Sequence, residues 1–227
     1  NPAGIWVEPI QGEGGVVVPP EGFLSGLRDI ADEHDVPLVV DEVQAGFGRT
    51  GEWFACEHED VTPDVMPVAK GAGGIGMPLS ATIYDSDLDF EPADHSGTFR
   101  GYLPAMEACI RTIDYVEDHD LLAHASDLGA YIQERLHTVA DDVPEVADVR
   151  GRGLFVGAEF RDDGEAAPDL VDEIRRECMR RGVLTWGGGR EANVLRLMPP
   201  LVMTREQAAT GLDVVTDVIR SVSETDS

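Results

Sequence analysis

The residue with the most distinctive chemistry is Lys70, the only lysine among the 17 basic side chains of this 227-residue chain. Arginine cannot replace lysine where the amine must lose its proton and attack a carbonyl, because guanidinium stays charged. A chain that otherwise uses arginine is therefore expected to keep Lys70 for covalent chemistry, most plausibly a Schiff base. The alternative is a surface lysine retained by chance.

Lys70 and Asp41 each end an apolar run that predicts a buried strand, 64–70 and 37–41 respectively. Strands that read as short apolar runs separated by helical segments indicate a parallel sheet covered on both faces. Ligands of such sheets bind at the carboxyl ends of the strands, so the amine and the carboxylate are expected to share one site. Taken alone, Asp41 could equally be a turn or helix-cap residue.

Five motifs occur in the order found in one enzyme family: Glu8–Gly15, Asp41–Gly51, Ala69–Gly71, Gly97–Gly101 and Leu195–Leu201. Together they resemble class III aminotransferases, which depend on pyridoxal 5'-phosphate (PLP). The likeness is greatest to diaminobutyrate–2-oxoglutarate transaminases, through Gly97–Gly101, Trp186–Arg190 and Pro78–Tyr84. It implies transfer of an amino group from L-2,4-diaminobutyrate to 2-oxoglutarate, with 4-aminobutyrate, ornithine or acetylornithine as alternative donors.

The resemblance also implies residue roles for cofactor binding and catalysis. Lys70 would bind the cofactor covalently and then, once released, act as a general base. Asp41 would keep the pyridine nitrogen protonated, and the opposite charges favour the ionised carboxylate. Gln44 would hydrogen-bond the ring oxygen. Thr98 would donate to the phosphate across a subunit interface, which implies a homodimer for the full-length protein.

Arg196 lies in an apolar run before Pro199 and Pro200, a poor environment for an unpaired charge. A buried arginine needs a carboxylate, and a substrate can supply one bidentately. The resemblance implies that Arg196 binds a substrate carboxylate and that Glu13 pairs with it and switches away to admit different substrates. A permanent structural salt bridge is the alternative.

Two other function classes compete. Residues 71–76 match G-x-G-x-x-G after a predicted strand, the fingerprint of an NAD-dependent oxidoreductase, but that fingerprint also requires a helix directly afterwards. Pro78 and the strand-like 79–84 follow instead. The other class is a non-catalytic binding protein that keeps the fold.

Composition narrows the partners and the compartment. A formal net charge of -27 argues against nucleic acid and anionic membrane as partners, since both require a basic face. The acidic excess favours a salt-adapted (halophilic) protein over an ordinary acidic one. Three widely spaced cysteines fit a reducing, cytoplasmic compartment and form no metal-ligand pattern. No apolar run approaches the length of a membrane span.

The expected architecture is α/β: the PLP-dependent transferase fold type I implied by the resemblance, with part of a parallel-rich large-domain sheet in 1–118 and an α+β small domain in 119–227. The predicted strands are 5–7, 37–41, 64–70, 79–84, 153–160 and two near Val183 and Val194. The predicted helices begin near Phe23 and Pro104 and cover 121–139 and 169–181, with a last helix from Thr204, where Thr204 and Gln207 match a capping box.

The chain opens without an initiator methionine and runs directly into a strand-like segment. The family's N-terminal half, which supplies a phosphate-binding loop and an aromatic ring stacked on the cofactor, has no counterpart here. We therefore expect a C-terminal fragment that is inactive alone.

Overall fold

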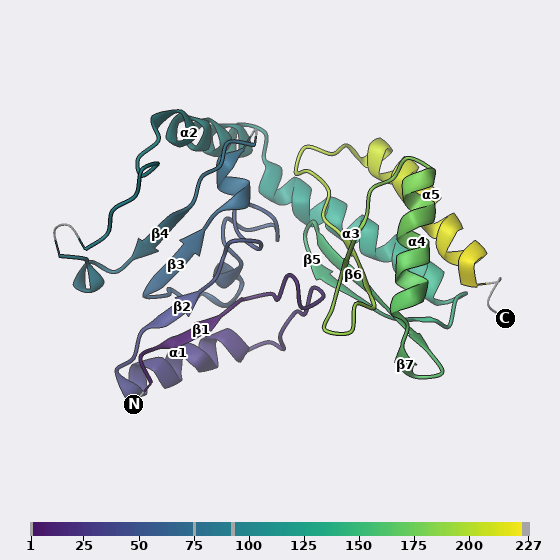
Figure 1. The fold of residues 1–227 in the computed structure, drawn as a ribbon, viewed down its shortest axis with the longest axis horizontal. Helices are drawn as coiled ribbons and strands as arrows, with labels where there is room; N and C mark the ends of the chain where they lie inside the picture. Colours follow the sequence, from purple (N-terminus) through teal and green to yellow (C-terminus); the bar gives the residue numbers. More distant parts are fainter. Residues whose placement is uncertain (1, 75, 92–93, 224–227) are drawn as a thin grey trace. The chain divides into compact units, whose positions relative to one another are not determined.

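The computed structural model describes residues 2–74, 76–91 and 94–223 and divides into two compact units (Figure 1). The first comprises Asn1–Pro9 and Pro19–Leu122, and the second comprises Ile10–Val18 and Ala123–Ser227. The short segment of residues 10–18 thus belongs with the later part of the chain.

The first unit is built on a four-stranded sheet in the order β1-β2-β3-β4. Its strands are Ile5–Val7, Leu38–Val40, Val65–Val68 and Ala81–Tyr84. The first three strands are parallel, as predicted, whereas β4 runs antiparallel to β3. The sheet is thus parallel-rich, as expected, with an antiparallel strand at its edge. The connection from β3 to β4 carries the 3-10 turn η2 (Lys70–Gly73) and no α-helix among its described residues.

Helices of the first unit bury one apolar face each. Helix α1 (Phe23–His34) joins β1 to β2, as its apolar spacing predicted, and buries Leu24 and Ala31. Helix α2 (Leu103–Asp118) buries Ala105 and Val116. The connection from β2 to β3 contains no α-helix and carries only the 3-10 helix η1 (Ala55–Glu59), and a further 3-10 turn, η3 (Ser86–Leu88), follows β4.

The second unit packs helices against an antiparallel sheet in the order β5-β6-β9-β8, with β7 paired to β6 (Figure 1). Its elements are α3 (Leu121–Ala140), β5 (Val146–Arg152), β6 (Phe155–Asp162), β7 (Glu165–Ala166), α4 (Pro168–Arg180), β8 (Trp186–Gly188), β9 (Val194–Leu197) and α5 (Arg205–Ser223). Apolar side chains of α3, α4 and α5 form one core with alternate residues of β5, β6 and β9.

Three strands of this unit differ from the sequence prediction, and one of them is the two-residue β7, which was not predicted. Strand β5 was not predicted, because its residues 146–152 are interrupted by charged side chains and a glycine and its register shifts between Val146 and Asp148. The strand expected near Val183 lies at Trp186–Gly188. The predicted capping box is confirmed: the Thr204 backbone N–H donates to Gln207 Oε1 (3.0 Å), and the Gln207 N–H donates to Thr204 Oγ1 (3.2 Å).

None of the helices in the described part of the chain has the length and apolar composition of a membrane span.

Candidate functional site

Asp41 directly follows β2, at the carboxyl end of that strand. Its backbone N–H donates to the Val7 carbonyl oxygen (2.8 Å), and its Oδ1 accepts from the Val43 N–H (3.1 Å). The side chain is half-buried. Gln44, also half-buried, lies three residues further along the same loop. The first bond extends the parallel pairing by one residue, and the second turns the chain away, so both fix Asp41 at the sheet edge.

Lys70 lies at the corresponding end of the neighbouring parallel strand. Val39 pairs with Val65 in the parallel register, and the Glu42 N–H donates to the Pro67 carbonyl oxygen (3.1 Å). Two residues after β3, Lys70 begins η2 with φ 46° and an exposed side chain. A left-handed backbone is unfavourable for a non-glycine residue and is enriched at functional sites. Lys70 and Asp41 therefore follow the carboxyl ends of two adjacent parallel strands, at the same edge of one sheet.

Close backbone packing joins the Asp41 loop to the Lys70 turn. A Cβ on Gly71 would lie 2.9 Å from the Phe47 Cβ, a distance that ordinary side chains do not reach. Phe47 itself is buried and makes edge-to-face contacts with Trp53 and Phe54. Gly71, directly after the lysine, is therefore required for this contact, which fixes the turn against the loop.

Glu42 is a buried residue of this loop that the sequence argument did not single out. It is 1% exposed, and its Oε1 accepts from the Cys56 backbone N–H (2.8 Å). Burial raises the pKa of Glu42 above its ordinary value, and burial together with the Glu42 carboxylate raises the pKa of the Cys56 thiol to about 12. Val40 is buried, Asp41 is half-buried and Glu42 is buried, which continues the alternation of the strand. That alternation could have indicated that the Glu42 side chain points into the core.

Thr98 lies in an exposed turn that runs from Gly97 to Gly101. The Arg100 N–H donates to the Gly97 carbonyl oxygen (3.1 Å), and Gly101 adopts φ 72°. Among the described residues, no hydrogen bond joins Thr98 to Lys70 or to the Asp41 loop. The described part of this chain therefore shows no direct bond between Thr98 and the other predicted cofactor residues.

In the second unit, Arg196 and Glu13 form the predicted ion pair. Arg196 is 1% exposed; its Nη1 and Nη2 donate to the two carboxylate oxygens of Glu13 (3.1 and 2.9 Å). Its Nε donates to the Gly187 carbonyl oxygen (2.9 Å), and Nη1 also donates to that of Gly12 (3.0 Å). The Glu13 side chain is 71% exposed. A buried guanidinium thus presents its fork to one solvent-accessible carboxylate, which a substrate carboxylate could replace.

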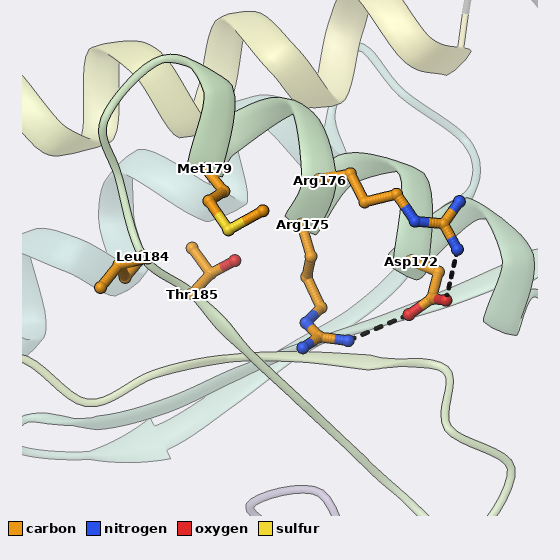
Figure 2. Close-up of a pocket in the computed structure, with 6 residues that line it drawn as sticks. All are labelled: Asp172, Arg175, Arg176, Met179, Leu184 and Thr185. Carbon is orange, nitrogen blue, oxygen red and sulfur yellow. Dashed lines mark hydrogen bonds and ion pairs between the residues drawn. The ribbon is translucent and has the colours of Figure 1, made fainter.

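A separate pocket of about 260 Å³ lies beside α4 in the second unit (Figure 2). It is lined by Asp172, Arg175, Arg176, Met179, Leu184 and Thr185. Asp172 accepts from Arg175 Nη1 and from Arg176 Nη2, both at 3.0 Å. One carboxylate therefore pairs both guanidinium groups of the pocket, and none of the sequence-predicted site residues contributes to it.

The structure also bears on the competing interpretations. Within residues 2–74, 76–91 and 94–223, no group of histidine, cysteine and acidic side chains could hold a metal ion. The G-x-G-x-x-G match covers residues 71–76, of which Ile75 lies outside the described residues. The rest leads from the 3-10 turn η2 to strand β4, without an intervening helix. The described residues of this stretch therefore offer no helix N-terminus of the kind that a dinucleotide pyrophosphate requires.

Comparisons with known proteins agree with the motif analysis. The sequence profile of the family described as "Aminotransferase class-III" matches residues 1–219. A leucine/methionine racemase of Thermococcus litoralis is 39% identical over 227 residues, covering 98% of this chain and 51% of that protein. A diaminobutyrate–2-oxoglutarate aminotransferase of Rhizobium meliloti is 39% identical over 215 residues, covering 90% of this chain and 45% of that protein.

A solved structure with the same fold is the ornithine aminotransferase of Toxoplasma gondii, in which PLP partially occupies the active site. The similarity has a TM-score of 0.91 at 32% identity and covers 98% of this chain and 52% of that one. The chain thus spans about half the length of the relatives it matches.

Proposed function

This chain belongs to the class-III aminotransferase family, whose members depend on PLP, and we propose that the protein that carries it transfers an amino group from an ω-amino acid to 2-oxoglutarate. The observation that supports this proposal is that Lys70 and Asp41 follow the carboxyl ends of two adjacent parallel strands. L-2,4-diaminobutyrate is the donor we favour, with ornithine, acetylornithine and 4-aminobutyrate as alternatives.

The residues of the first unit fit PLP by their chemistry. When bound, the cofactor supplies a carbonyl for the amine and an aromatic ring that withdraws electrons from the reacting carbon. Lys70 would hold it and act as general base at the substrate carbon. Asp41 would accept a hydrogen bond from the ring nitrogen, and Gln44 would donate one to the ring oxygen. Thr98 would donate to the phosphate from a partner subunit, and we therefore propose a homodimer.

Arg196 and Glu13 set substrate recognition in this proposal. A substrate with a distal carboxylate, such as 2-oxoglutarate, pairs with the Arg196 guanidinium after Glu13 has moved aside. A donor that places an amine there leaves the Glu13–Arg196 pair closed. The exposed Glu13 side chain and the burial of Arg196 support this division of roles, because a solvent-accessible carboxylate turns into water at a lower cost than a buried guanidinium.

The decisive experiment adds PLP to the protein that carries this sequence, follows absorbance near 400 nm, and then screens amino donors with 2-oxoglutarate. We expect the cofactor band to form and glutamate to accumulate with diaminobutyrate. Residues 1–227 alone are expected to give no turnover. Cofactor binding without glutamate from any donor would overturn the proposal.

A second candidate function is amino-acid racemisation, because the racemase of Thermococcus litoralis is 39% identical. A racemase returns the amino group to the same carbon skeleton and needs no 2-oxo acid. Incubating L-leucine or L-methionine with the PLP-loaded protein, without 2-oxoglutarate, separates the two functions: appearance of the D-enantiomer identifies a racemase, and its absence favours the transaminase.

Asp41→Asn tests the ring-nitrogen contact. The amide is nearly isosteric and can still accept the Val43 N–H through its oxygen, but it cannot hold the ring nitrogen protonated. We expect kcat to fall by about 100-fold or more, because a ring whose nitrogen has lost its proton withdraws electrons from the reacting carbon much less strongly. Steady-state kinetics with saturating PLP measure this, and an unchanged kcat would remove Asp41 from the site.

We propose that the protein is cytoplasmic, on the basis of its three widely spaced cysteines, and adapted to salt, on the basis of its net charge of -27. Added salt screens repulsion among the excess carboxylates, so the melting temperature is expected to rise by several degrees between 0.1 and 2 M KCl. Differential scanning calorimetry checks this, with sucrose at matched osmolality as the control for solvent exclusion. A melting temperature that stays flat or falls with KCl would contradict salt adaptation.

A further inference from the structure

The loop that carries Glu13 is a small hairpin, residues 11–17, closed by two hydrogen bonds between the backbones of Gln11 and Val17. The hairpin lies on the sheet face opposite the helix core, since Val16 would contact a Cβ on Gly157 at 3.1 Å. Val16 is fully buried and has φ 54°, which is unfavourable for a β-branched residue. Such a strained conformation persists only where the surroundings hold it.

The surroundings include a row of residues across three strands. Arg150 of β5 pairs with Gly157 of β6, which pairs with Arg196 of β9, so the three lie side by side on one sheet face. Arg196 holds one part of the hairpin, through the Gly12 carbonyl and the Glu13 carboxylate. Gly157, without a side chain, leaves the space between the two arginines in which the hairpin lies.

Arg150 holds the other part of the hairpin. Its Nε and Nη2 donate to the Gly15 carbonyl oxygen (3.1 and 2.8 Å), and Nε also donates to that of Val16 (3.2 Å). Its Nη1 donates to the carboxylates of Asp148 (2.7 Å) and Glu159 (2.8 Å), which orient the guanidinium. Charge-assisted hydrogen bonds of this kind are stronger than neutral ones.

We propose that Arg150 is a positioning residue for substrate selection: it clamps the hairpin 11–17 from the side opposite Arg196 and thereby sets how firmly Glu13 stays on Arg196. The proposal rests on the proposed function for its effect on substrates. The closed Glu13–Arg196 pair competes with a distal substrate carboxylate for the same guanidinium. Loosening the hairpin therefore favours substrates that carry this carboxylate and disfavours donors that require the pair.

Arg150→Gln tests the clamp, and Arg161→Gln is the matched control. Arg161 donates to the same Glu159 carboxylate through Nε and Nη2 (2.9 and 2.8 Å), yet it makes no hydrogen bond to the hairpin among the described residues. Two readouts apply to each variant: amide hydrogen exchange of the peptide that covers residues 10–18, and the ratio of kcat/KM for L-glutamate to kcat/KM for the ω-amino donor.

We expect Arg150→Gln to speed exchange in residues 10–18 at least tenfold and to shift the kcat/KM ratio at least tenfold toward L-glutamate, with Arg161→Gln changing neither. Unchanged exchange and ratio in Arg150→Gln, or equal changes in both variants, would overturn the proposal. If the wild-type protein transfers no amino group, the proposed function fails, while the exchange data still decide whether Arg150 holds the hairpin. If Arg150→Gln does not fold, Arg150→Lys replaces it, because lysine keeps the charge but lacks the guanidinium fork. The exchange rate of residues 10–18 and the kcat/KM ratio then test the proposal in the same way.

Discussion

Lys70→Arg is expected to lower kcat by at least about a thousandfold while the fold survives. The substitution keeps the positive charge and removes the only amine in the chain that can attack a carbonyl and move a proton. General acid–base catalysis alone contributes about 10²- to 10⁴-fold, and covalent attachment of the cofactor is lost as well. Because the Lys70 side chain is exposed, the melting temperature should change little.

The measurement compares single-turnover rates of the wild type, Lys70→Arg and Lys70→Ala with saturating PLP. A small primary amine such as methylamine should restore part of the activity of Lys70→Ala, because it can enter the space left by the side chain, but not that of Lys70→Arg. Near-normal turnover by Lys70→Arg would refute the central role of this lysine, whatever the substrate.

The elements around Lys70 and Asp41 were largely predictable from the sequence. Strands β1, β2 and β3 read as short apolar runs, and a helix with regular apolar spacing joins β1 to β2, so the parallel pairing of those two strands followed from general rules. The antiparallel β4 did not, because sheet direction depends on what the connecting segment can span. The segment from Lys70 to β4 carries only the 3-10 turn η2 among its described residues, and no sequence pattern in it fixes the direction of the strand that follows.

In the second unit, sequence patterns contain too little information to predict which residues far apart in the chain contact each other. Arg196 was predicted to need a carboxylate, and Glu13 is its partner, at a separation of 183 residues. The resemblance supplied that pairing; periodicity could not have done so. Arg150 was missed, because its partners are backbone carbonyl oxygens of residues 15 and 16, and backbone acceptors leave no mark on the amino-acid sequence. Segment 10–18 was likewise not predicted to join the later part of the chain.

Arg196→Lys is the second change with a large expected effect, here on recognition of the 2-oxo acid. The guanidinium fork places two donors on one carboxylate and a third on the Gly187 carbonyl, whereas an ammonium is a single point of donation on a flexible stem. A Cβ on Gly188 would lie 2.6 Å from Arg196 Nε, so the backbone of Gly188 packs closely against the guanidinium and restricts its orientation.

Loss of one charge-assisted hydrogen bond costs about 1.5–3 kcal/mol, which corresponds to roughly a 10- to 150-fold weaker affinity. KM for 2-oxoglutarate should therefore rise by that factor, while kcat for an ω-amino donor that needs no contact with Arg196 changes much less. Arg176→Lys is the matched control, because Arg176 pairs with Asp172 on α4 (Figure 2) and should leave both constants unchanged.

The KM and kcat pattern separates recognition from folding. A merely structural arginine would, on replacement, lower the melting temperature and the active fraction, and so reduce apparent kcat for every substrate equally with KM unchanged. A recognition role instead raises KM for substrates with a distal carboxylate and spares the others. If Arg196→Lys lowers all rates in parallel, the Glu13–Arg196 pair is a permanent salt bridge, and the carboxylate of 2-oxoglutarate is bound by other residues.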